Sequence, residues 1–141
     1  MSGSKTFLDT NIIVYAFDAS AKRKHEIARQ ILIDLWDSGR GMISTQVLQE
    51  FYVTVTQKIP KPLDRKWAIQ TIKDLLHWDV VVNDGDAIME AVDIQTRCRF
   101  SFWDAMIIQA ALRGGASVIL SENLDGGGKV PGVSIKNPFL F

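Results

Sequence analysis

The sequence predicts a single α/β domain in which helices cover both faces of a central, mainly parallel β-sheet. Short apolar runs alternate along the chain with longer segments of helical periodicity, which is the pattern of repeated strand–helix–strand units. The chain has 141 residues, of which 47% are hydrophobic, so it is long enough for one core and too short for two domains. We therefore expect a three-layer α/β/α domain over residues 1–141, with residues 1–4 as a disordered end or a cloning remnant.

The predicted strands are short and apolar. The run at 118–120 is continuous Val-Ile-Leu, which favours a strand that is buried on both faces. The three glycines at 126–128 predict a flexible loop before the last strand. The strands are expected at residues 6–8, 42–43, 80–82, 118–120 and 133–135.

Helical segments separate these strands. In the segment at 22–36 the apolar side chains recur on one face of 3.6-residue period. Ser44 or Thr45 is placed to cap the helix that follows, although the β-branched run at 53–56 weakens the prediction of a helix there. Asp84 is placed to cap a later helix. The helices are expected at about residues 12–17, 22–36, 45–56, 64–76, 84–96 and 101–112.

Composition limits the classes of protein that fit. The formal net charge is zero, from 16 basic and 16 acidic residues, so bulk charge does not indicate a polyanionic partner. The single cysteine, Cys98, excludes an internal disulfide and a cysteine-based zinc site, and it fits a reducing cytoplasmic setting. No apolar run approaches the roughly 20 residues of a membrane span, and the N-terminus lacks a signal-peptide pattern. We expect a cytoplasmic protein without membrane contact.

Acidic side chains lie where the carboxyl ends of the strands should meet. Asp9 ends the first strand, Glu50 lies in the helix after the second strand, and Asp104 lies in the first turn of the helix at 101–112. Ligand sites in open parallel sheets lie beyond the carboxyl ends of the strands, so these side chains are expected at one edge. Converging carboxylates repel one another and stay ionised only with a cation among them. Oxygen ligands suit Mg²⁺ or Mn²⁺.

Each carboxylate also has a purely structural interpretation. Asp9 could cap the first helix, which Thr10 would then open. Asp104 stands three residues after Ser101, at the spacing of a capping box with Asp in place of Glu or Gln. Glu50 could be a solvated helix residue. Spacing alone does not decide between a metal site and these structural roles.

Four local sequences favour the functional interpretation. They are FLDTNIIVYAFD at 7–18, STQVLQEF at 44–51, SFWDA at 101–105, and SENL at 121–124 together with NPF at 137–139. In this order and at this spacing they resemble the motifs of the PIN-domain family, in particular its VapC-like toxins. The resemblance spans nearly the whole chain.

The resemblance implies a metal-dependent ribonuclease that is the toxin of a toxin–antitoxin pair. The acidic residues of the family match Asp9, Glu50 and Asp104, which would hold Mg²⁺ or Mn²⁺ and hydrolyse RNA phosphodiester bonds. Asn11 would orient a carboxylate, and further supporting polar groups would be Ser44, Thr45 and Ser121. The resemblance also implies a cognate antitoxin and a homodimer as partners.

The sequence departs from the family pattern at position 123. The family commonly places an acidic residue there, in a Ser/Thr-x-Asp pattern, and this chain has Asn123. An amide oxygen can ligate Mg²⁺ but carries no charge, so a second metal subsite should be weaker. Asp125 and Glu122 are the candidates for compensation.

Two alternatives remain open at this stage. A PIN-fold module that binds RNA or protein without cleavage would be consistent with Asn123. A haloacid-dehalogenase-like phosphatase also places Asp after the first strand, but it would need a second acid two residues later, where this chain has Asn11.

Overall fold

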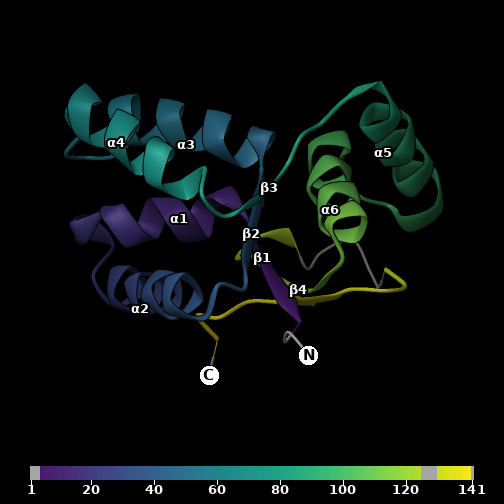
Figure 1. The fold of residues 1–141 in the computed structure, drawn as a ribbon, viewed down its shortest axis with the longest axis horizontal. Coiled ribbons are helices and arrows are strands. Elements are labelled where there is room, and N and C mark those ends of the chain that lie inside the picture. Colours follow the sequence, from purple (N-terminus) through teal and green to yellow (C-terminus); the bar gives the residue numbers. More distant parts are fainter. Residues whose placement is uncertain (1–3, 125–129, 141) are drawn as a thin grey trace.

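The computed structural model describes residues 4–124 and 130–140, and within them one sheet organises the fold (Figure 1). Its strands run in the order β3-β2-β1-β4-β5, and each neighbouring pair is parallel. The predicted α/β domain with a central parallel sheet is therefore confirmed. The strands are β1 (Lys5–Leu8), β2 (Gly41–Ser44), β3 (Asp79–Val81), β4 (Ala116–Leu120) and β5 (Ser134–Lys136).

Helices cover both faces of this sheet. Figure 1 shows α1 to α4 on one side of the strands and α5 and α6 on the other. A short 3₁₀ turn, η1, joins the first two helices. The helical elements are α1 (Thr10–Phe17), η1 (Ala19–Ala21), α2 (Arg23–Ser38), α3 (Thr45–Gln57), α4 (Arg65–Leu75), α5 (Gly85–Cys98) and α6 (Phe102–Gly114).

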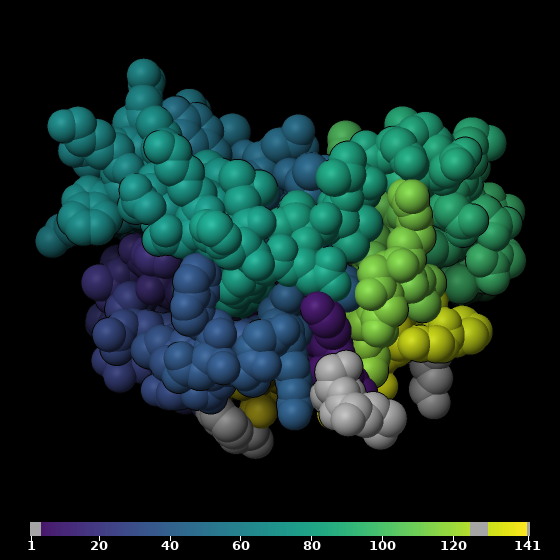
Figure 2. Space-filling model, in the orientation of Figure 1, coloured from purple at the N-terminus to yellow at the C-terminus, as the bar shows by residue number. Residues whose placement is uncertain are grey.

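The core lies on both sides of β1. Phe7 and Leu8 point to opposite faces of the sheet, as successive strand residues do, and both are fully buried. α6 contributes an unbroken buried run over residues 105–111, which is expected of a helix that is apolar on most of its surface. On the face drawn in the space-filling view, β1 is visible as a small purple patch at the lower centre, between its blue and green neighbours (Figure 2). The first two residues of β1 are half-buried, and the last two, which precede Asp9, are fully buried.

The helix predicted at 45–56 is confirmed as α3, which continues through the β-branched run at 53–56 to Gln57 because Val55 is buried and packing outweighs intrinsic propensity. One local feature differs from the sequence prediction. α1 begins at Thr10 rather than at residue 12, with Asp9 as its N-cap. The loop predicted at 126–128 lies outside the described residues. In the part of the chain that is described, no helix combines the length and the apolar character needed to cross a membrane.

The start of β2 requires a residue without a side chain. A Cβ atom at Gly41 would overlap the ring of Trp78, whereas a Cβ atom at Gly85 would meet nothing within 4 Å. Gly41→Ala should therefore lower the free energy of unfolding by about 1–3 kcal/mol, the usual cost of overpacking. Gly85→Ala is the control and should change stability by less than about 1 kcal/mol. Urea unfolding of the two variants measures the difference, and equal stabilities would show that the Trp78 ring moves freely.

Candidate functional site

Asp9 occupies the carboxyl end of the central strand. It follows β1 directly, and it also caps α1, so its structural interpretation is correct as well. The backbone N–H of Thr10 donates to Asp9 Oδ1 at 2.7 Å, and the Ser121 hydroxyl donates to Oδ2 at 2.7 Å. Ser121 is fully buried at the end of β4, the strand beside β1. Asp9 is therefore held by its own helix and by the neighbouring strand.

Two other carboxylates act on Asp9. Desolvation by burial raises the pKa of Asp9, and the charges of Glu50 and Asp104 raise it further, against the hydrogen bonds from Ser121 and Thr10. Such like-charge coupling requires the three carboxylates to lie in one neighbourhood. The same features make the ionised form of Asp9 costly in the absence of a cation.

Glu50 is tied to Asp9 through one residue. The Thr10 hydroxyl donates to Glu50 Oε1 at 2.6 Å, while its backbone N–H binds Asp9. Glu50 itself is exposed on α3, and its second oxygen receives a long hydrogen bond of 3.5 Å from Gln46. Thr10 therefore links the acidic residues of α1 and α3.

Asp104 lies in the first turn of α6. Its backbone N–H donates to the hydroxyl of Ser101, the N-cap, at 3.1 Å. The capping role belongs to Ser101, which leaves the Asp104 carboxylate outside that hydrogen bond. The residue before it, Trp103, offers its carbonyl oxygen to Gln46 of α3 at 3.4 Å. Gln46, on the same helix as Glu50, thus contacts the helix that carries Asp104.

The donor set suits a hard cation, but it is not gathered around one point. Within residues 4–124 and 130–140, no group of three or more His, Cys, Asp or Glu side chains is close enough to hold a metal ion. The chemistry nevertheless fits: the ligands available are carboxylates, and one of them has a pKa raised by burial and by the other two. A bound cation would offset both of these causes.

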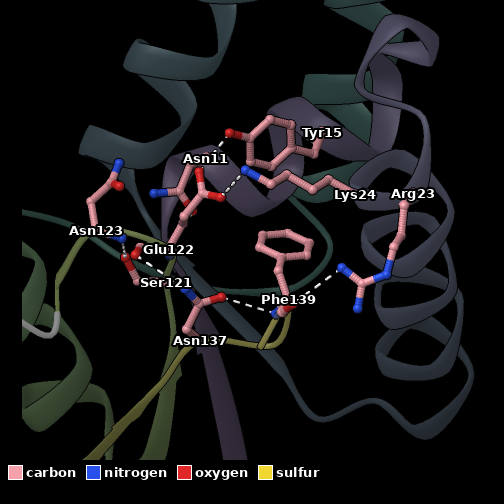
Figure 3. Close-up of polar contacts among 9 residues, drawn as sticks. All are labelled: Asn11, Tyr15, Arg23, Lys24, Ser121, Glu122, Asn123, Asn137 and Phe139. Carbon is pink, nitrogen blue, oxygen red and sulfur yellow. Dashed lines mark hydrogen bonds and ion pairs between the residues drawn. The ribbon is translucent and has the colours of Figure 1, made fainter. Parts of the chain in front are cut away.

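The turn after β4 is fixed by a separate polar network (Figure 3). Glu122 accepts a hydrogen bond from the Tyr15 hydroxyl at 2.6 Å and forms an ion pair with Lys24. Burial opposes ionisation of Glu122, but the contacts with Lys24 and Tyr15 outweigh it and lower its pKa. The carboxylate of Glu122 is thus engaged by Lys24 and Tyr15, and its role toward a metal stays a prediction.

The other polar residues predicted to support the site, Asn11, Ser44 and Thr45, accept hydrogen bonds from backbone N–H groups. Asn11 accepts the N–H of Glu122 at 3.3 Å, so its observed contact is with the turn after β4 and not with a carboxylate. Ser44 caps α3 and accepts from Val47 at 3.4 Å, and Thr45 accepts the N–H of Asn83 at 3.3 Å. Neither hydrogen bond involves Asp9, Glu50 or Asp104.

The side chain of Asn123 is exposed at the turn after β4. The backbone N–H of Asn123 donates to Ser121 Oγ at 3.3 Å, which makes Ser121 a common partner of Asp9 and of this turn. Asp125 falls in the segment 125–129, of which nothing is described. The roles of Asn123 and Asp125 toward a metal stay predictions.

A groove of about 610 Å³ extends from the acidic residues. At one end lie Asp9 and Glu50, and Lys58 lies at the far end of α3. Its walls are largely apolar. The other lining residues are Thr10, Asn11, Val14, Tyr15, Gln49, Val53 and Thr54.

Sequence reasoning missed two residues of this site. Thr10 was assigned only to the helix start, and Gln46 was not singled out. The available signal for Gln46 was its position four residues before Glu50, which places both on one helix face. For Thr10 the chain offered no signal, because its contact with Glu50 joins α1 to α3.

The fold and the site define a parallel α/β domain with an acidic site at the carboxyl ends of its central strands. The sequence matches the PIN domain family over residues 6–125, which is most of the chain. The chain belongs to the PIN domain family. No curated protein sequence matches it significantly.

Solved structures of similar fold come from toxin–antitoxin systems. A toxin–antitoxin complex from Klebsiella pneumoniae superposes with a TM-score of 0.72 at 18% identity, covering 97% of this chain and 100% of that one. A sarcin–ricin loop cleaving VapC toxin from Mycobacterium tuberculosis gives 0.66 at 20%, covering 89% and 98%. DNA-bound VapBC from Salmonella typhimurium gives 0.67 at 21%, covering 96% and 99%. At these identities the likeness concerns the fold.

The raised pKa of Asp9 predicts a dependence of stability on pH. The folded protein holds the Asp9 proton more tightly than the unfolded chain, so Asp9 lowers the free energy of unfolding as pH rises from the ordinary value of 3.8 through the raised pKa. This loss persists at neutral pH. Asp9→Asn cannot ionise and keeps a good N-cap, so it should be more stable than the wild type at pH 7 without metal, with the difference shrinking toward pH 4.

The matched control is Asp84, which also caps a helix. The backbone N–H of Ala87 and then the Arg113 guanidinium lower the pKa of Asp84, so its ionised form stabilises the fold above the ordinary pKa. Asp84→Asn should therefore be neutral or destabilising at pH 7. Urea unfolding between pH 4 and 8 in EDTA measures both variants. If Asp9→Asn loses as much stability as Asp84→Asn, the role of Asp9 in the metal-free protein is only that of a helix N-cap.

Proposed function

We propose that this PIN domain is a metal-dependent endoribonuclease that hydrolyses RNA phosphodiester bonds and acts as the toxin of a toxin–antitoxin pair. The observation that carries the proposal is the position of Asp9 at the carboxyl end of the central strand, where Ser121 holds it and Thr10 links it to Glu50. Membership of the PIN family and the toxins among the structures of similar fold support it. Membership of the PIN family also argues against the alternative hypothesis of a haloacid-dehalogenase-like phosphatase.

The residues proposed to hold Mg²⁺ or Mn²⁺ are Asp9, Glu50 and Asp104. When bound, such an ion polarises the scissile phosphate and lowers the pKa of a bound water. The chain contributes orientation: Ser121 fixes Asp9, and Thr10 directs Glu50 toward the same end of the sheet. These hydrogen bonds preorganise the carboxylates before the ion arrives.

The groove between α1 and α3 is the proposed path of the RNA. Lys58 is placed to contact a phosphate away from the cleavage point, and the apolar walls fit ribose and base surfaces. The proposed antitoxin and homodimer contacts need exposed apolar side chains, because such patches mark protein interfaces. Among the helices that expose such side chains are α2, α4 and α5, through Ile33, Trp36, Trp67, Ile69, Ile88, Met89 and Val92.

A second candidate function is a PIN-fold module that binds RNA or protein without cleaving. Asn123, which lacks the charge expected at this position, favours it, and so does the absence of a preformed group of three ligands among the described residues. The two candidates differ in one measurable property, which is Mg²⁺-dependent cleavage.

The deciding experiment is cleavage of structured and unstructured RNA with and without Mg²⁺. The wild type should cleave only with the metal, and Asp9→Ala should lose activity by about a hundredfold or more, as expected when a charged ligand is removed. Asp104→Asn should also be inactive, while its melting temperature without metal holds or rises because a like charge is gone. A wild type that binds RNA but never cleaves it would establish the second candidate. Normal Mg²⁺ stabilisation of a destabilised Asp104→Asn variant would make Asp104 a structural residue.

Asn123 is proposed to weaken a second metal subsite and so to limit the rate. Asn123→Asp adds one full negative charge to the proposed set of metal ligands, so it should lower the Mg²⁺ concentration for half-maximal cleavage severalfold. If Asp125 compensates for Asn123, then Asp125→Ala should lower the cleavage rate more in the wild-type background than in the Asn123→Asp background. Titration of Mg²⁺ against cleavage rate for the four combinations measures this coupling. Identical metal dependence of the parent and Asn123→Asp would remove position 123 from the set of ligands.

A further inference from the structure

Gln46 is a buried glutamine in contact with the acidic site. It lies in the first turn of α3 with 6% of its surface exposed, and it precedes Glu50 by four residues. Its amide nitrogen donates to Glu50 Oε2 at 3.5 Å and to the backbone oxygen of Trp103 at 3.4 Å. Both partners are acceptors, so the orientation of the amide is determined: the reversed amide would set oxygen against oxygen.

The fold gains little from this arrangement. Gln46 Oε1 is buried and has no hydrogen-bond partner among the described residues, and an unsatisfied buried oxygen destabilises the fold. In return the amide makes only two long hydrogen bonds. Gln109 has an unpartnered Oε1 too, but its amide nitrogen makes two short bonds, at 2.8 Å to Asn83 and 2.9 Å to Met106. The amide of Gln109 is thus held by short hydrogen bonds to its own helix and to Asn83, whereas the hydrogen bonds of Gln46 are long.

The position of Gln46 has a clear consequence for Glu50. Glu50 is an exposed side chain that would otherwise sample many rotamers, and ordering it costs conformational entropy. Thr10 holds its Oε1 from α1, and Gln46 holds its Oε2 from α3. The second acceptor of Gln46 is the carbonyl of the residue before Asp104. One amide therefore connects a carboxylate on α3 to the turn of α6 that carries another.

We propose that Gln46 is a positioning residue that sets the separation between the Glu50 and Asp104 carboxylates for cation binding. The inference rests on the proposed function, because it assigns Gln46 a role toward the same ion. The long hydrogen bonds agree with it, since contacts in unliganded sites tighten only when the reacting complex forms. Loss of a residue that orients ligands typically weakens metal binding by about 10–100-fold.

Calorimetric titration of the metal-free protein with Mg²⁺ tests the proposal without relying on activity. Gln46→Met keeps the volume and removes the donor, and Gln46→Asn keeps the amide but shortens its reach. Both should bind Mg²⁺ at least about tenfold more weakly than the wild type. Gln109→Met and Gln109→Asn are the matched controls and should bind within about twofold of it. Melting temperatures with and without Mg²⁺ report the folding of every variant, and either Gln46 variant that folds is sufficient.

Each result has a distinct meaning. Weakening confined to the Gln46 variants supports the positioning role. Wild-type affinity in those variants overturns it and leaves the proposed function intact. Equal weakening in the Gln109 variants also overturns it, because loosened packing then explains the loss. A wild type that neither binds Mg²⁺ nor cleaves RNA overturns the proposed function, and the role of Gln46 with it.

Discussion

The placement of one carboxylate at the end of the central strand constrains the rest of the site. β1 lies in the middle of the sheet, between β2 and β4, so Asp9 emerges where other strands also end. Burial and like charges oppose its ionisation, while Ser121 from the end of β4 and the first N–H of α1 favour it. The Ser121 hydroxyl gives the larger part of this support and the Thr10 N–H the smaller, and the fold places both groups beside Asp9. The residues around Asp9 serve to keep a costly charge in place.

The architecture was predictable because its signals are local. Strand–helix alternation indicated the parallel sheet, and Ser44, Asp84 and Ser101 cap their helices as expected from their residue types. The local signal was weakest in α3, where the β-branched run at 53–56 disfavours a helix and the burial of Val55 outweighs this preference. The order of the strands was not predictable from any local pattern, since it depends on which crossover each helix makes.

The site was predictable only in its principal residues. Asp9, Glu50 and Asp104 stand in local sequences that resemble known motifs, whereas the partners of side chains depend on the packing of distant elements. Glu122 illustrates the limit: it stands beside Asn123 in the sequence, yet Lys24 from α2 and Tyr15 from α1 draw its carboxylate elsewhere (Figure 3). No pattern within the turn after β4 could have indicated this.

The pairing of Glu122 has a consequence for the charge of the site. Under the proposed function, with Glu122 paired with Lys24 and an amide at position 123, the carboxylates left for a cation among the described residues are Asp9, Glu50 and Asp104. The combined charge of these three exceeds that of one divalent ion and falls short of that of two. Under the proposed function, a second ion would need negative charge from elsewhere, and the phosphate of the RNA is a group that supplies it. Metal binding and substrate binding would then be linked, each raising the affinity for the other, because coupling between two ligands is reciprocal.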